Sequence, residues 1–221
     1  MTTFVLVAGA WHGPWAWDRV TPLLHDAGAR TVAPALGEGD VGLHDHADDV
    51  VAALDGIDGI DGDGVVLVGH SYAGLVVREA ADQRPDRVRH LVLVDGWAGP
   101  DGTSLYDLAP APFVQALRGR TSGGRIAVPP PAAVGIDDPD DAAWLAERMR
   151  PQPARTFEEP TRLTGAADRI PGTAILCRPS VYPFEQCAKA IGYRTVPIDG
   201  PHDVMLTRPG ALARLILEVS A

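Results

Sequence analysis

An apolar run that ends in a serine between small residues constrains this 221-residue chain more than any other feature. Residues 65–75 read VVLVGHSYAGL, and a helix-forming sequence follows. This is a variant of the G-x-S-x-G nucleophile elbow, in which the serine lies at a sharp turn between a strand and a helix. Ala73 replaces the second glycine but is still small. The alternative is a glycine turn in which Ser71 is incidental, but the strand before it and the helix after it favour the elbow.

The rest of the chain alternates between short apolar runs and helical patterns. The runs are continuous, as in strands that are covered on both faces. We expect strands at 3–8, 29–33, 65–69, 89–94, 173–177 and 194–198, and helices near 16–27, 46–54, 72–83 and 209–219. This order predicts a six-stranded, mostly parallel, doubly wound sheet with right-handed crossovers.

One long segment interrupts the alternation. From about residue 97 to 170 the sequence has no clear strand, and prolines break it at 129–131. Because this is too long for a simple connection, we expect an inserted cap or lid. Its best helix is Asp140–Arg150. No linker separates independent domains, so residues 1–221 are expected to form one domain with this insertion.

Charge and patterning exclude several partners. The net charge is −10 and no Lys/Arg run occurs, so a nucleic-acid partner is not expected. No apolar run reaches the length of a membrane span, and the N-terminus lacks the features of a secretion signal, so a cytoplasmic protein is expected. The sequence does not decide between a monomer and a homodimer.

No metal or cofactor is expected. His44, His46 and the aspartates after them resemble a metal cluster, but further ligands are missing, and an acidic helix start explains them better. The acidic, glycine-rich stretch 55–64 lacks the spacing of a calcium loop and is expected to connect a helix to a strand. Cys177 and Cys187 give neither a disulfide framework nor metal-ligand spacing, and no nucleotide fingerprint occurs.

Several motifs together resemble the α/β-hydrolase fold over essentially the full chain. The closer resemblance is to the small plant and bacterial branch that contains methylesterases and hydroxynitrile lyases. The motifs, in order, are FVLVAGAWHGPWAW (4–17), GHSYAG (69–74), LVLVDG (91–96), MRPQPARTFEEP (149–160) and GPHDVMLTRP (200–209). The resemblance implies a cofactor-free enzyme that acts on a small molecule.

The same resemblance implies roles for several residues. Ser71 would be the nucleophile, and His202, just after the last strand, would take its proton. The backbone amides of Ala10 and Tyr72 would form the oxyanion hole. The family loop usually reads His-Gly where this chain has Ala8-Gly9, so a bracing hydrogen bond is missing. Trp11 lies next to the expected oxyanion hole, and the sequence supports core packing and substrate contact equally as its role. Trp15 and Trp17 are expected in the core.

The family's acid is absent from its usual place. In relatives an aspartate follows the strand that ends here at Cys177, but the best-aligned residue is Ser180. Asp95, at the end of LVLVD, is one replacement, since some α/β-hydrolases carry their acid there. The alternatives are that Asp95 caps a turn, or that Ser71 and His202 act as a dyad in which Ser180 or a backbone carbonyl holds the histidine.

These observations favour a serine esterase for a small or medium carboxylic ester, lactone or acyl group. The alternative is a lyase or cyclase of secondary metabolism with the same fold. Hydroxynitrile lyases of this branch carry threonine at the position of Gly9 and lysine at that of Asp203, so cyanohydrin cleavage is disfavoured. The cap side chains expected to shape an apolar pocket are Tyr106, Phe113, Trp144, Met149 and Phe157.

Overall fold

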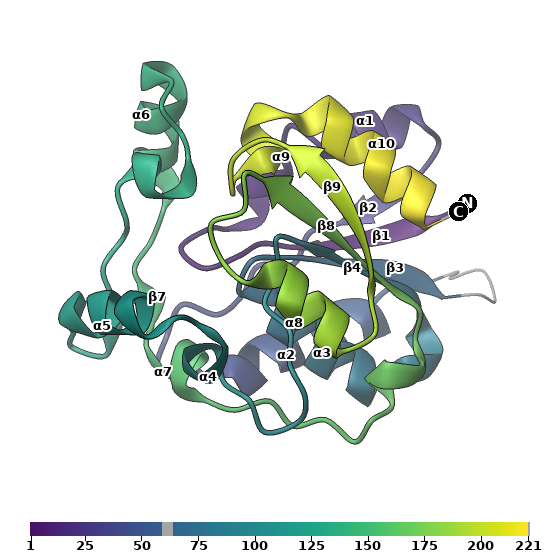
Figure 1. The fold of residues 1–221 in the computed structure, drawn as a ribbon. Helices are drawn as coiled ribbons and strands as arrows, with labels where there is room; N and C mark the ends of the chain where they lie inside the picture. Colours follow the sequence, from purple (N-terminus) through teal and green to yellow (C-terminus); the bar gives the residue numbers. More distant parts are fainter. Residues whose placement is uncertain (59–63, 221) are drawn as a thin grey trace.

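A central parallel sheet organises the molecule (Figure 1). The computed structural model describes residues 1–58 and 64–220. Six strands form the sheet in the order β2-β1-β3-β4-β8-β9, and each neighbouring pair is parallel. They are β1 (Thr3–Val7), β2 (Arg30–Val32), β3 (Val65–His70), β4 (Val88–Val94), β8 (Gly172–Arg178) and β9 (Arg194–Asp199). The predicted doubly wound sheet is confirmed, with all six strands at the expected places.

Helices cover both faces of this sheet, because alternate strand residues point to opposite sides. On one face pack α2 (Leu43–Asp55), α3 (Ala73–Gln83) and α8 (Phe184–Ala190). On the other pack η1 (Pro14–Trp17), α1 (Thr21–Asp26), α9 (Val204–Thr207) and α10 (Pro209–Val219). In β3, Val65 and Leu67 belong to the first core, and Val66 and Val68 to the second. This two-sided burial explains the continuous apolar runs.

Between β4 and β8 the chain leaves the sheet and forms the segment that we call the cap, residues 97–170. Its helices are α4 (Leu105–Leu108), α5 (Ala111–Gly119), α6 (Pro139–Arg148) and α7 (Arg155–Glu158), with 3₁₀ turns η3 (Pro131–Val134) and η4 (Ala167–Arg169). Much of the cap lies beyond the carboxyl ends of the strands, and α6 projects furthest from the sheet (Figure 1). The helix expected at Asp140–Arg150 corresponds to α6.

The cap also contains strands that the sequence did not predict. A small antiparallel sheet joins β5 (Thr121–Ser122), β6 (Arg125–Ile126) and β7 (Gln152–Pro153). The expectation that this segment contains no strand was therefore wrong. A strand of two residues is too short to leave an apolar pattern in the sequence. The short η2 turn (Pro85–Arg87) links α3 to β4.

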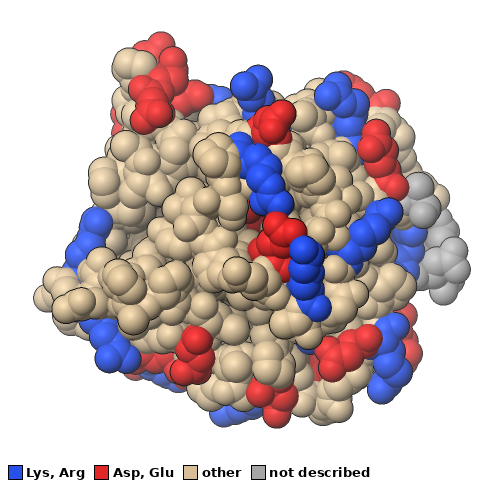
Figure 2. Space-filling view, viewed as in Figure 1, with Lys and Arg blue, Asp and Glu red and all other residues tan. Residues whose placement is uncertain are grey.

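The remaining expectations concern the 55–64 connection, membrane spans and the charge of the surface. The helix-to-strand connection expected at 55–64 lies partly outside the described residues. None of the described helices is long and apolar enough to cross a membrane. Figure 2 shows that acidic and basic side chains are interspersed on one face, and that its area toward the cap is largely uncharged.

Candidate active site

Ser71 lies at a strained turn between β3 and α3. Its φ is 52°, in the left-handed region that is costly for a residue with a Cβ. Its amide donates to Val94 O at 3.1 Å, and its carbonyl accepts from the Gly74 and Trp97 amides at 3.0 Å each. A Cβ at Gly69 would lie 2.7 Å from Ala73 O. The turn therefore requires small residues around the serine, as the elbow motif predicts.

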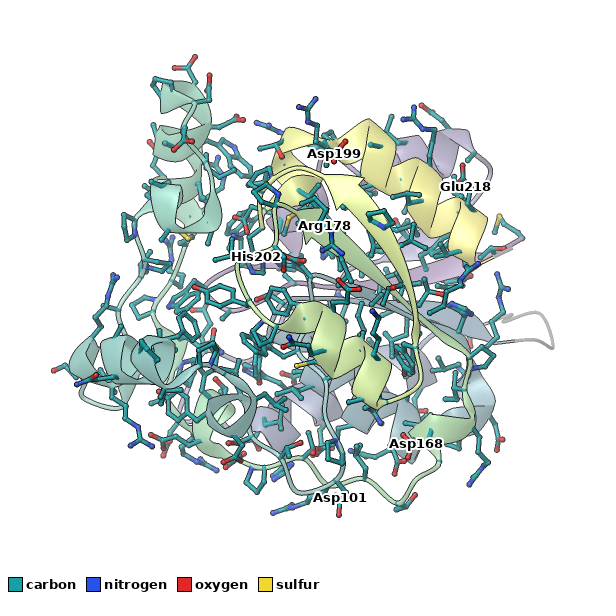
Figure 3. The ribbon with its side chains drawn as sticks, in the orientation of Figure 1. Asp101, Asp168, Arg178, Asp199, His202 and Glu218 are labelled. Carbon is teal, nitrogen blue, oxygen red and sulfur yellow. The ribbon has the colours of Figure 1, made fainter. Side chains whose placement is uncertain are left out.

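His202 reaches Ser71 from the other end of the chain. It lies in the loop between β9 and α9, and its Nε2 is 2.9 Å from Ser71 Oγ. Figure 3 shows the residue between the end of the sheet and the cap. The imidazole is thus placed to accept the hydroxyl proton of Ser71.

Asp95 holds the opposite side of that imidazole. His202 Nδ1 donates to Asp95 Oδ2 at 2.9 Å. Asp95 itself is buried, with a φ of 44°. Its second oxygen, Oδ1, accepts from the Cys177 amide at 2.9 Å, and its own amide donates to Ile175 O at 2.8 Å. The carboxylate is therefore fixed by strand β8, although it belongs to the end of β4.

Ser180 takes no part in this arrangement. It is exposed, and its hydroxyl donates to Tyr182 O at 2.9 Å. Of the alternatives considered from the sequence, the geometry favours Asp95 as the group that orients His202. A turn-capping role alone does not account for the bond to the imidazole.

The loop after β1 comes close to the serine. A Cβ at Gly9 would lie 3.0 Å from the Ser71 Cβ and 2.8 Å from His70 Nδ1, so only glycine fits here without displacement. Within the described part of the chain, no hydrogen bond occupies the amide of Ala10 or of Tyr72. Two free amides beside a serine hydroxyl provide the type of donor set that an oxyanion hole needs.

Trp11 belongs to the same loop and contacts the cap. Its φ is 65°, its amide donates to Gln152 Oε1 at 3.0 Å, and its ring packs edge-on against Phe157. Trp17 is fully buried in the core, whereas Trp15 packs against Trp144 of the cap. Trp11 lines the pocket over the serine and also packs against both cores, so both positions considered for it remain compatible with its place in the fold.

The pocket over Ser71 has a volume of about 220 Å³ and is mainly apolar. It is lined by Trp11, Ser71, Trp97, Leu105, Phe113, Ala116, Leu117, Arg120, Pro129, Ala133, Val134, Phe157, Tyr182, Phe184 and His202. The Phe184 ring stacks on His202, with centroids 5.5 Å apart. Phe113 and Phe157 line it as expected. The expectation was wrong for three cap residues, which are not part of the pocket wall. Tyr106 makes an edge contact with Phe157, Trp144 packs against Trp15, and Met149 belongs to the second core.

A second, more polar pocket of about 250 Å³ shares Trp11 with the first. Gly9, His12, Tyr72 and Gln152 contribute to its wall. Trp11 therefore contributes to two cavities of different polarity.

Sequence analysis missed the buried residues behind His202. His12 Nε2 lies 2.9 Å from Asp203 Oδ2, and both side chains are buried. His70, also buried, donates from Nε2 to His202 O at 3.1 Å. The available signals were the carboxylate directly after His202 and the histidine in the aromatic loop, but nothing in the sequence links residues that are 191 positions apart.

The histidines considered as metal ligands have other partners. His46 donates from Nε2 to Gly37 O at 2.9 Å, and its Nδ1 is 3.0 Å from the Tyr72 hydroxyl. His44 pairs with Glu79 at 2.6 Å. Ligand-type atoms of His70, His202 and Asp203 do lie within 4.8 Å of one another. Since His202 is bonded to Ser71 and Asp95, and Asp203 to His12, hydrogen bonding accounts for this cluster as well.

Comparisons with known proteins show the family to which the chain belongs. The Alpha/beta hydrolase family matches residues 4–215. A carbendazim hydrolyzing esterase of Nocardioides sp. (strain SG-4G) is 31% identical over 96% of this chain and 97% of its own length. An alpha-hydroxynitrile lyase of Arabidopsis thaliana is 30% identical over 46% of this chain and 42% of its own.

Among solved structures, an extracellular alpha/beta-hydrolase from a Paenibacillus species aligns with a TM-score of 0.88 at 23% identity. The alignment covers 99% of this chain and 98% of that one. It was described as sharing structural and functional homology with Tobacco Salicylic Acid Binding Protein 2. The fold inferred from the sequence motifs is confirmed by this match.

Proposed function

Because this chain belongs to the α/β-hydrolase family and its esterase relative matches nearly its whole length, we propose that it hydrolyses carboxylic esters through an acyl-enzyme on Ser71. The observation that carries the proposal is the continuous hydrogen-bonded series Ser71–His202–Asp95, with 2.9 Å at each step. It lies at the wall of an apolar pocket.

The chemistry follows from the roles of these atoms. His202 Nε2 takes the hydroxyl proton while Ser71 Oγ attacks the ester carbonyl carbon. The amides of Ala10 and Tyr72 donate to the oxyanion that forms, at the N-terminal end of α3, where the helix dipole favours negative charge. His202 then protonates the leaving alcohol. A water molecule, deprotonated by His202, releases the acid and regenerates Ser71.

The pocket supports a compact apolar acyl or alcohol group. Six aromatic side chains contribute to its wall: Trp11, Trp97, Phe113, Phe157, Tyr182 and Phe184. A volume of about 220 Å³ is small for a ligand site, so short or ring-shaped substituents fit better than long chains. Carbendazim, which the name of this relative gives as its substrate, is one compound to test.

A lyase is the second candidate, since a hydroxynitrile lyase is among the relatives. Such lyases resemble this chain but carry threonine at the Gly9 position and lysine at the Asp203 position. A Cβ at Gly9 would lie 2.8 Å from His70 Nδ1, so this loop has no room for threonine. Asp203 provides a negative charge where the lyases have a positive one. The bond between Asp95 and His202 also supports hydrolysis over a cyclase that needs no acid.

Hydrolysis of p-nitrophenyl acetate and butyrate tests the proposal. The wild type should turn over both esters, and a fluorophosphonate should label Ser71. Ser71→Ala should abolish both, whereas Ser180→Ala, which removes an exposed hydroxyl, should retain them. Absence of turnover and of labelling in the folded wild type would rule out the esterase, and release of cyanide from mandelonitrile would support the lyase.

A further inference from the structure

A buried pair of ionisable groups connects the two halves of the candidate active site. His12 follows the oxyanion loop, and Asp203 directly follows His202. Their side chains are 2% and 0% exposed, and Nε2 lies 2.9 Å from Oδ2. His12 Nδ1 lies 2.7 Å from the carbonyl oxygen of Ala10. One imidazole therefore touches both the oxyanion loop and the segment that carries the catalytic histidine.

The hydrogen-bond partners define the protonation of His12. A carbonyl oxygen only accepts, so Nδ1 must carry a proton. A buried carboxylate also accepts, so Nε2 must carry a second one. Burial lowers the pKa of His12, but the charge and hydrogen bond of Asp203, together with the Ala10 carbonyl, outweigh it and raise the pKa above its ordinary value. Burial would raise the pKa of Asp203, but His12 keeps it below its ordinary value.

The neighbouring groups do not replace His12 in this pair. His70 lies 3.9 Å from Asp203 Oδ1, but burial first, and then the charge of His202, lower its pKa to about 3, so it is neutral. His12 also lines the polar pocket, whose other ionisable lining residues are Glu38, His46, Tyr72, Arg148 and Arg150. In the hydrogen-bond network of the described residues, only His12 bonds to the Asp203 carboxylate.

We infer that His12 and Asp203 are positioning residues: their charged contact fixes the oxyanion loop relative to the catalytic His202. The inference rests on the proposed function for its kinetic consequence, but not for its structural one. The two joined segments come from opposite ends of the chain, and the alignment of the Ala10 amide with Ser71 depends on both. Deprotonation of His12 leaves one ring proton for two acceptors, the Ala10 carbonyl and the Asp203 carboxylate, so one of the two hydrogen bonds is lost. Activity should therefore decline as pH rises through the pKa of His12.

The first test uses NMR of the ¹⁵N-labelled wild type and needs no substrate. His12 should carry protons on both ring nitrogens at pH 7.5, as an imidazolium. In Asp203→Asn, His12 should become neutral at this pH because its counter-charge is gone. A neutral, singly protonated His12 in the wild type would overturn the inference, whatever the enzyme's activity.

The second test compares His12→Gln with His25→Gln, a change at an exposed histidine on α1. Glutamine donates a hydrogen bond but carries no charge. In His12→Gln, kcat for p-nitrophenyl butyrate should fall at least tenfold with KM changed less than twofold, and the alkaline decline of kcat should disappear. His25→Gln should match the wild type.

The kinetic and NMR results distinguish failure of the positioning role from failure of the proposed function. An unchanged kcat and pH profile in a folded His12→Gln variant would overturn the positioning role. If the wild type shows neither turnover nor labelling of Ser71, the proposed function fails instead, and the NMR titration still tests the charged pair. Should His12→Gln not fold, Asp203→Asn gives the same kinetic comparison.

Discussion

The carboxylate of Asp95 lies 2.9 Å from His202 Nδ1, although it ends strand β4 and not strand β8. The contact between Asp95 and His202 is possible because β4 lies between β3 and β8 in the sheet. The carboxyl ends of these parallel strands meet at one edge, so an acid after either β4 or β8 can face the same imidazole. The loop after β8 still contributes, since the Cys177 amide holds the other oxygen of Asp95.

Replacement of Asp95 by asparagine tests this relationship. Asp95→Asn keeps the shape but offers an amide to His202, so the imidazole loses its orientation and its counter-charge. We expect kcat for p-nitrophenyl butyrate to fall by up to about 10⁴-fold, the order seen when such an acid is lost. Ser180→Ala is the matched control and should retain the wild-type rate. Equal rates for Asp95→Asn and the wild type would show that Asp95 only caps the turn.

A methyl group at Gly9 should displace the oxyanion loop. In Gly9→Ala the new Cβ would meet the Ser71 Cβ, His70 Nδ1 and His70 O at 2.8–3.0 Å, all atoms of the elbow. Removal of one oxyanion donor costs about 10²–10³-fold in kcat, and we expect a fall of that order. Gly210→Ala, where a Cβ meets nothing within 4 Å, should leave kcat unchanged. A fully active Gly9→Ala enzyme would contradict the assignment of Ala10.

The size of the pocket should govern the preferred acyl length. Leu117 lines the pocket, and its truncation to alanine should extend the cavity. The ratio of kcat/KM for p-nitrophenyl octanoate over acetate should rise severalfold, while stability falls by about 2–5 kcal/mol because a buried leucine is lost. Leu24→Ala, a fully buried leucine in the opposite core, should cost similar stability without changing the ratio. An equal ratio in both variants would place the acyl group elsewhere.

Acid should destabilise the fold through His70. Its pKa is about 3 in the folded protein, because burial disfavours the imidazolium, against 6.5 in the unfolded chain. For a histidine with a lowered pKa, the unfolded state binds more protons, so stability is lost as pH falls below about 6.5. At pH 5 His70 should cost about 2 kcal/mol relative to pH 7.5, at 1.36 kcal/mol for each unit.

Urea unfolding at both pH values measures this effect. Between pH 7.5 and pH 5, the free energy of unfolding of His70→Gln should fall by about 2 kcal/mol less than that of the wild type. His12 and His46 are present in both proteins, so their contributions cancel in this comparison. An identical pH dependence in the two proteins would show that His70 does not carry the acid sensitivity.

Much of the architecture could be predicted from local sequence. The apolar runs gave all six strands of the large sheet, because strands buried on both faces need continuous apolar residues. The elbow at Ser71 was predictable because the turn geometry demands small residues at particular positions. The two-residue strands of the cap were not predictable from the sequence. Their pairing joins residues up to 28 positions apart and leaves no apolar periodicity.

The sequence by itself determined the alternation of strands and helices, the turn at Ser71 and the histidine after the last strand. Only the tertiary structure decided which carboxylate faces His202, which cap side chains face the pocket, and that His12 pairs with Asp203. The physical reason is that local patterns report burial and turn geometry, whereas these contacts depend on which strand ends become neighbours in space.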